Sequence, residues 1–242
     1  MNVNQIVFSD EITLWWDKEW DCSDAISYRA CLSGGGCEME KHPTSTHVTF
    51  ASLTPNTGYE IALFRIEENG AETSLVNLKV QTKEAKKRID VTKAPYSCVG
   101  DGQALNTHAL QRALDDCTPD ACVYFPAGVY LSGALTVHSD TEIYLDEGAT
   151  LQGSARAEDY LPRIKSRFEG LEMECYSSLL NMGTLDHASG ANCRNIVIRG
   201  KGAILGGGLA LCNEMIFLPK TRRSSRPART AIPCPGVCAI AF

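Results

Sequence analysis

The sequence predicts an all-β protein, with a small β-sandwich first and the first rungs of a parallel β-solenoid after it. Over about the first eighty residues, short runs of alternating apolar and polar residues are separated by turn signals, and no helical period occurs. After residue 100, one helix precedes β-rich runs of three to five residues, joined by turns of two to four. Such short runs do not suit a sandwich and are typical of solenoid rungs.

Residues 1–82 are predicted to form the sandwich. Apolar and polar residues alternate over 12–16, as in a half-buried strand. The segment 53–59, which reads LTPNTGY, resembles the LxPxTxY signature of fibronectin type III domains. The resemblance implies that the Tyr59 hydroxyl anchors the corner before the next strand and that Trp16 is the buried aromatic residue of the second strand. An unrelated small sandwich is the alternative.

Residues 83–95 are predicted to link this sandwich to the second domain. The segment 83–88, which reads KEAKKR, is charged and poor in apolar residues, as linkers between domains often are. A basic patch that binds phosphate is the alternative.

Residues 96–218 are predicted to form the capping helix and the rungs. Asn106 or Thr107 is the expected N-cap. The helix has an apolar stripe made of Leu110, Ala113, Leu114 and Cys117. We expect this stripe to close the open end of the stack by covering unpaired edge groups and the first core layer. Strands of the rungs are expected at 122–125, 129–131, 135–137, 143–145 and 149–151.

Four segments of this region resemble one known family. They read GDG at 100–102, VYFPAGVY at 123–130, LDEGATL at 145–151 and NIVIRGKGAILGGG at 195–208. As a set, within a match over about residues 89–208, they resemble the N-terminal part of glycoside hydrolase family 28, the polygalacturonases. The resemblance implies a right-handed parallel β-helix and a pectin-degrading enzyme that hydrolyses galacturonan with inversion and needs no cofactor.

The catalytic residues that the family implies are not matched. The family carries an Asn-Thr-Asp motif, an Asp-Asp pair, a His-Gly motif and an Arg-Ile-Lys motif. The nearest strings are Asn106-Thr107-His108 in the helix cap, Asp115-Asp116 on the exposed side of the helix, and Arg163-Ile164-Lys165. The position of the last string matches the family's early insertion and not its late Arg-Ile-Lys motif, so we interpret it as a coincidence. No catalytic residue is assigned, and we expect a truncated N-terminal fragment without activity.

The candidate residues for binding substrate are Arg167, Glu169 and Tyr176, with Tyr160 beside them. They lie in the matched region and would hold a pectic polysaccharide or oligogalacturonide. Arg163, Lys165 and Arg167 would add positive potential to a cleft that receives an anionic sugar chain. A non-catalytic module that binds pectic oligosaccharides is therefore an alternative function.

A polysaccharide lyase of the same superfamily is the other alternative. Such lyases usually need Ca²⁺ held by clustered carboxylates, and the sequence indicates no such cluster. His42 and His47 lie near a loop without a third ligand at metal spacing, so solvated polar residues are expected there. No metal ligand is assigned.

Composition restricts the partners and the compartment. A net charge of −6 argues against a nucleic-acid partner, and no run approaches the ~18 apolar residues of a membrane span. The N-terminus does not read as a signal peptide. Eleven cysteines, an odd number without a CxxC pair, favour reduced thiols and a cytoplasmic location. A secreted protein is the alternative.

The segment 219–242 differs from the rest. It contains five Lys or Arg residues and no Asp or Glu, and its strand periodicity disappears. We interpret it as an atypical tail, foreign to the family, that follows a frame change; a basic tail that binds a partner is the alternative. About three rungs with one cap fall near the minimum for a stable solenoid. Marginal stability and self-association through the uncapped end are therefore expected.

Overall fold

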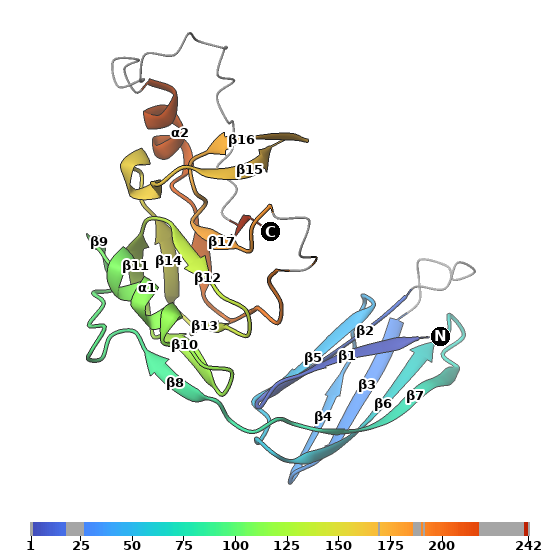
Figure 1. Cartoon of the computed structure of the whole chain (residues 1–242). Helices are drawn as coiled ribbons and strands as arrows, with labels where there is room; N and C mark the ends of the chain where they lie inside the picture. Colours follow the sequence, from blue (N-terminus) through green and yellow to red (C-terminus); the bar gives the residue numbers. More distant parts are fainter. Residues whose placement is uncertain are drawn as a thin grey trace. The chain divides into compact units, whose positions relative to one another are not determined.

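The computed structural model describes residues 2–17, 27–168, 170–185, 190, 192–217 and 240–241. The chain divides into two compact units, Met1–Lys86 and Lys87–Phe242 (Figure 1). The second unit begins inside the predicted linker, because strand β8 (Lys87–Asp90) pairs with a strand of that unit. The linker over 83–95 was therefore predicted too long. Of the 219–242 tail, the structure describes the backbone of two residues, and the remainder lies outside the described residues.

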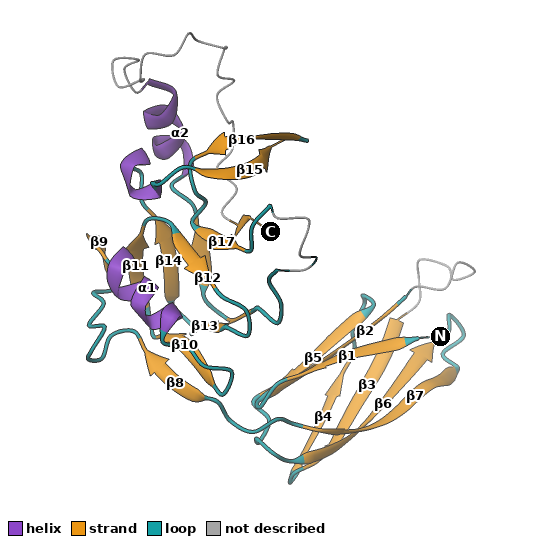
Figure 2. Ribbon diagram, viewed as in Figure 1, coloured by secondary structure: helices purple, strands orange, loops and turns teal. Residues whose placement is uncertain are grey.

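The first unit is a sandwich of two antiparallel sheets (Figure 2). One sheet has the order β1 (Val3–Val7), β2 (Glu11–Trp16) and β5 (His47–Ala51). The other has the order β4 (Cys37–Lys41), β3 (Ser27–Gly34), β6 (Gly58–Ile66) and β7 (Glu72–Gln81). The alternation seen in the sequence turns every second side chain inward, and Ile12 and Leu14 are completely buried.

Both aromatic expectations for this unit are confirmed. The Tyr59 hydroxyl accepts a hydrogen bond from the backbone N–H of Thr54 at 2.9 Å, and its side chain is buried. Trp16 is also buried and packs edge-on against Tyr28, with ring centres 4.9 Å apart. The corner and the buried tryptophan are those of a fibronectin type III-like sandwich.

The second unit is a parallel β-helix. One sheet has the order β8, β10 (Ala121–Phe125), β13 (Glu142–Leu145) and β18 (Val197–Gly200). A second has the order β9 (Asp101–Leu105), β11 (Gly128–Ser132), β14 (Ala149–Gly153) and β19 (Ala203–Leu205). A third has the order β12 (Leu135–Val137), β17 (Leu180–Met182) and β20 (Ile240–Ala241). Two of the sheets have four strands, so the stack has one turn more than predicted.

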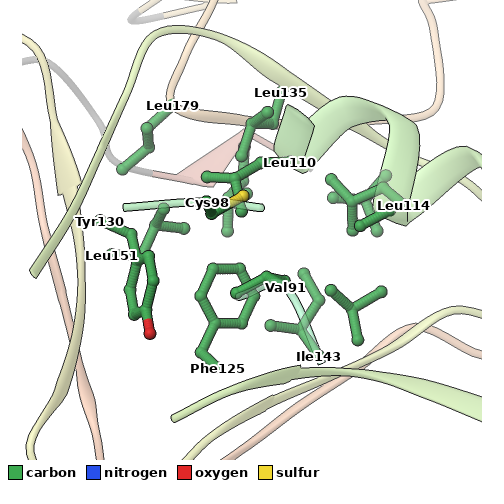
Figure 3. Close-up of a cluster of buried hydrophobic side chains, with 14 of the residues drawn as sticks. Val91, Cys98, Leu110, Leu114, Phe125, Tyr130, Leu135, Ile143, Leu151 and Leu179 are labelled. Atoms are coloured by element: carbon green, nitrogen blue, oxygen red, sulfur yellow. The ribbon is translucent and has the colours of Figure 1, made fainter. Parts of the chain in front are cut away.

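The predicted capping helix is α1 (Thr107–Asp115), which lies between β9 and β10 in the chain. Leu110, Ala113 and Leu114 are buried as predicted, and Cys117 packs at the border of the same core. Figure 3 shows these leucines above Phe125 and Ile143, within the layered interior of the β-helix.

The side chain of Asn106 does not cap this helix. Asn106 stands at the N-cap position without a side-chain capping bond. Its amide donates to the carbonyl oxygens of Val99 and Ala104 and accepts from the N–H of Val99. The Asn106 side chain therefore stabilises the segment 99–104 that precedes the helix.

Two segments of the chain depart from the regular coil. Between β14 and β17 the chain forms a short 3₁₀ helix (Ala157–Tyr160) and an antiparallel arm of β15 (Ile164–Phe168) and β16 (Leu171–Cys175). After β19 it forms α2 (Gly208–Phe217), which contacts the 3₁₀ helix. Figure 1 shows the two strands of the arm running side by side away from the stacked strands. Neither helix α1 nor helix α2 is long and apolar enough to cross a membrane, within the part of the chain that the structure describes.

Candidate functional site

The base of the arm holds an exposed arginine against a tyrosine ring. Arg163 precedes β15 and Tyr176 follows β16, so the antiparallel register brings the two residues together. The guanidinium carbon of Arg163 lies 4.6 Å from the centre of the Tyr176 ring. Tyr176 packs against the core with its apolar body, and the cation–π contact holds the guanidinium at the surface.

Hydrogen bonds fix this base. The Ser177 hydroxyl donates to the carbonyl oxygen of Pro162 at 2.9 Å, and the Ser177 N–H donates to that of Tyr160 at 3.0 Å. Ser177 is buried. Pro162 and Ser177, which form the next pair towards the body of the β-helix, are therefore joined across the arm.

The other predicted binding residues have different surroundings. Arg167 forms an ion pair with Glu172 at 2.8 Å across the arm, and both side chains are more than half exposed. Such a pair is weak and leaves the arginine accessible. Glu169 lies outside the described residues.

The prediction that Tyr160 contacts a ligand is wrong. Its side chain is completely buried, and its hydroxyl donates to the carbonyl oxygen of Ser154 at 2.8 Å. Burial raises the pKa of Tyr160 to about 12. The 3₁₀ helix turns this ring towards the core. A helix of four residues is too short to give a periodic pattern in the sequence, so this orientation was not predicted.

A second group of aromatic and basic residues lies on the outer face of the β8–β10–β13–β18 sheet. We call Arg88, Tyr124, Tyr144 and Arg199 the arginine–tyrosine ladder. Tyr124 and Tyr144 are paired in register and stack with ring centres 5.9 Å apart. Arg88 lies 4.5 Å from the ring centre of Tyr124, and Arg199 lies 4.7 Å from that of Tyr144.

Sequence reasoning missed the ladder. Tyrosines recur at the outward position of successive rungs, and that recurrence was the available signal. The acidic neighbours make the ladder a poor anion site: Glu142 binds Arg199 at 2.7 Å, and Asp146 accepts the Tyr124 hydroxyl. The ladder is therefore better explained as a brace between turns.

The carboxyl pair at the C-terminal end of α1, Asp115 and Asp116, is exposed as predicted. Asp115 accepts from the Gln111 amide at 2.8 Å and contacts His138 at 2.9 Å, whereas Asp116 accepts from the Tyr96 hydroxyl at 3.0 Å. The Gln111 hydrogen bond lowers the pKa of Asp115. Both carboxylates therefore have structural hydrogen-bond partners.

Two further carboxyl groups of this unit have lowered pKa values. The backbone N–H of Ala104 lowers the pKa of Asp101, and the Tyr124 hydroxyl lowers that of Asp146. A glycosidase general acid needs a raised pKa to stay protonated, so these three groups are unsuited to that role. The described residues include no cluster of three or more His, Cys, Asp or Glu placed to hold a metal ion.

Comparisons with known proteins agree with this architecture. Over 157 residues, 64% of its length, the chain is 35% identical to an exo-poly-alpha-D-galacturonosidase of Dickeya chrysanthemi. Its structure aligns with a family 28 exopolygalacturonase of Yersinia enterocolitica at a TM-score of 0.67 and 24% identity, over 83% of this chain and 40% of that one. A fibronectin type III domain of human collagen XX aligns at 0.30 and 21% identity, over 34% of this chain and 86% of that one.

No protein-family model matches the chain. The chain spans about a quarter of the Dickeya protein, 26% of its length. The alignment with the Yersinia enzyme covers more of the chain than either unit contains, so it extends over parts of both units. The resemblance predicted from the four sequence segments is confirmed: the chain is similar in sequence to the exo-poly-alpha-D-galacturonosidase of Dickeya chrysanthemi and in fold to the family 28 exopolygalacturonase of Yersinia enterocolitica.

Proposed function

We propose that this chain recognises galacturonan at the base of its arm, as part of a polygalacturonase-like glycoside hydrolase that acts by inverting hydrolysis. The observation that carries the proposal is the exposed guanidinium of Arg163, held on the ring of Tyr176. Each unesterified unit of galacturonan carries a carboxylate, and a guanidinium binds a carboxylate through paired N–H donors.

Arg163 is the cation on which the proposal rests. Lys165 and Arg167 follow it on β15 and are exposed, but Lys165 lies opposite Glu174 and Arg167 is paired with Glu172. A guanidinium already restrained by a ring loses less freedom on binding than a mobile one. A negatively charged sugar chain is thus the ligand class that the base of the arm favours.

We further propose that the chain on its own binds galacturonan without hydrolysing it. Inverting hydrolysis requires one protonated and one ionised carboxyl group on opposite sides of the scissile bond. The absence of the family's Asn-Thr-Asp motif from the sequence, and the structural hydrogen bonds of Asp115 and Asp116, support this part of the proposal.

The binding test is electrophoresis of the 242-residue chain through gels that contain polygalacturonate. We expect the polymer to retard the chain, and Arg163→Ala to weaken the apparent affinity about tenfold, because hydrogen bonds to a charged group are lost. Arg112→Ala is the matched control, since Arg112 is an exposed arginine on α1. Equal mobility of both variants and the parent chain would contradict the assignment of the site.

The catalytic test measures reducing ends released from polygalacturonate. We expect no release by the purified chain. Galacturonate release would overturn the proposal of binding without hydrolysis, and absorbance from unsaturated products would instead indicate the lyase.

We also propose a cytoplasmic location, with an oligogalacturonide as the ligand there. The eight cysteines that the structure describes are free thiols, which supports a reducing compartment. Thiol labelling of the protein in intact cells tests this: rapid labelling of the partly exposed thiols by a membrane-permeant reagent alone is expected, and labelling by an impermeant reagent would point to secretion.

A further inference from the structure

The arm ends at a proline, and the side chain of a serine on the opposite strand binds the carbonyl oxygen of that proline. The last backbone pair of the arm joins Ile164 and Cys175. One step further towards the body lie Arg163 and Tyr176, and one step beyond them Pro162 and Ser177. Proline has no N–H to donate, so the strand ladder cannot continue there in the ordinary way.

Ser177 closes this position with its side chain. Its hydroxyl donates to the carbonyl oxygen of Pro162 at 2.9 Å, while its N–H turns to Tyr160 at 3.0 Å. Tyr160 is itself buried and bound to Ser154. The serine thus joins the outgoing strand of the arm to the incoming one and to the interior of the β-helix.

This bond lies directly beside the two residues that form the candidate site. Arg163 directly follows Pro162, and Tyr176 directly precedes Ser177. Without the bond, the two strands can separate at the base, and the guanidinium of Arg163 loses its fixed place 4.6 Å from the ring centre. A wider distribution of positions costs more entropy on binding a carboxylate.

We infer that Ser177 is a positioning residue, which holds Arg163 against Tyr176 so that the guanidinium is presented to a galacturonate carboxylate. The inference rests on the proposed function of the arm base. Ser177 acts through Arg163 and makes no contact with the ligand itself.

The test is a double-mutant cycle on the full chain, with calorimetric titration of trigalacturonate. We expect Ser177→Ala to weaken binding about three- to fivefold, the effect of losing one hydrogen bond. In the Arg163→Ala background the same substitution is expected to change nothing further, because interacting residues are not additive. Circular dichroism and thermal unfolding show whether each variant is folded.

Ser178→Ala is the matched control. Ser178 pairs with Asn181 through its backbone N–H and carbonyl oxygen, so removal of its hydroxyl is expected to leave binding unchanged. Parent-like affinity of Ser177→Ala, or an equal loss in both backgrounds, would overturn the positioning role and leave the proposed function standing. Parent-like affinity of Arg163→Ala would contradict the proposed function itself, and with it this inference.

Discussion

The first and last described turns of the β-helix contain the same kinds of strand but are finished differently. At the first turn, α1 buries Leu110 and Leu114 completely or nearly so. At the last turn, Ile204 of β19 is only partly buried, although it is paired in register with the completely buried Leu151 of β14, and Leu209 of α2 is 76% exposed. Among the described residues, no strand pairs with the outer edge of β18 or β19. An apolar rung is therefore stabilised by what covers it rather than by its own sequence.

A single side chain shows how the first end is protected. Gln111 on α1 donates to the carbonyl oxygen of Thr136 at 3.0 Å and accepts from its N–H at 2.8 Å. Thr136 lies on β12, the edge strand of its sheet. The glutamine amide thus satisfies backbone groups that would otherwise form an open edge. We expect the stability of the solenoid to fall from this end towards the last described turn.

The largest difference is expected from truncating a core-facing side chain at each end. Leu114→Ala should lower the free energy of unfolding by about 3 kcal/mol, because it leaves a cavity beneath α1. Ile204→Ala should lower it by only about 1 kcal/mol, because that side chain faces the core but is only partly buried. Urea unfolding of both variants measures this. Equal losses would contradict the difference between the two ends.

The next effect concerns the ion pair that holds β18, the edge strand of its sheet. Arg199 on β18 pairs with Glu142 at 2.7 Å, and their side chains are 14% and 4% exposed. Glu142→Ala should cost about 3 kcal/mol, because the Arg199 charge is left without its buried partner. Hydrogen exchange should accelerate first at β18 amides. Uniform acceleration across both units would contradict a local role.

A smaller effect is expected at β12, the edge strand that Gln111 covers. Gln111→Ala should lower the free energy of unfolding by about 1 kcal/mol, since β12 loses its side-chain partner while water replaces part of the bonding. The N–H of Thr136 should exchange faster in this variant. Unchanged exchange at Thr136 would show that the edge does not depend on the glutamine.

Self-association of the chain through the last described turn of the β-helix stays a prediction. We expect light scattering to detect a concentration-dependent dimer, and Leu209→Glu to reduce it by adding a charge to the apolar surface. Leu161→Glu is the matched control, because Leu161 is also an exposed leucine, with 54% of its surface accessible. A strictly monomeric chain at high concentration would contradict this prediction.

The smallest effect follows from pH. The Tyr124 hydroxyl lowers the pKa of Asp146 in the folded chain, so its stabilising contribution is present above the unfolded pKa of about 3.9 and is lost as pH falls through the folded value. Tyr124→Phe should therefore be less stable than the parent chain at pH 7, and the difference should shrink on acidification. A difference that is constant with pH would contradict this linkage.

The sequence predicted features that depend on local periodicity. Alternation predicted that Ile12 and Leu14 are buried in the sandwich, and helical spacing predicted that Leu110 and Leu114 are buried in the core of the β-helix. The Tyr59 corner was predictable because its partner, Thr54, lies only five residues away.

Features that depend on register were not predicted. The contact between Arg163 and Tyr176 exists because an antiparallel arm folds back between them. Arg88 approaches Tyr124 across two strands that are distant in the sequence. Tyr160 was misassigned because an aromatic residue in a short 3₁₀ helix gives no sign of the direction in which it points. Pairing between segments, rather than composition, decides such contacts.

The most direct test of the central proposal is a calorimetric comparison of trigalacturonate with its methyl ester on the 242-residue chain. If Arg163 reads the carboxylate, the free acid should bind at least about tenfold more tightly than the ester, and Arg163→Ala should remove most of that preference. Equal binding of acid and ester, or a preference that survives in Arg163→Ala, would contradict recognition of galacturonan at the base of the arm.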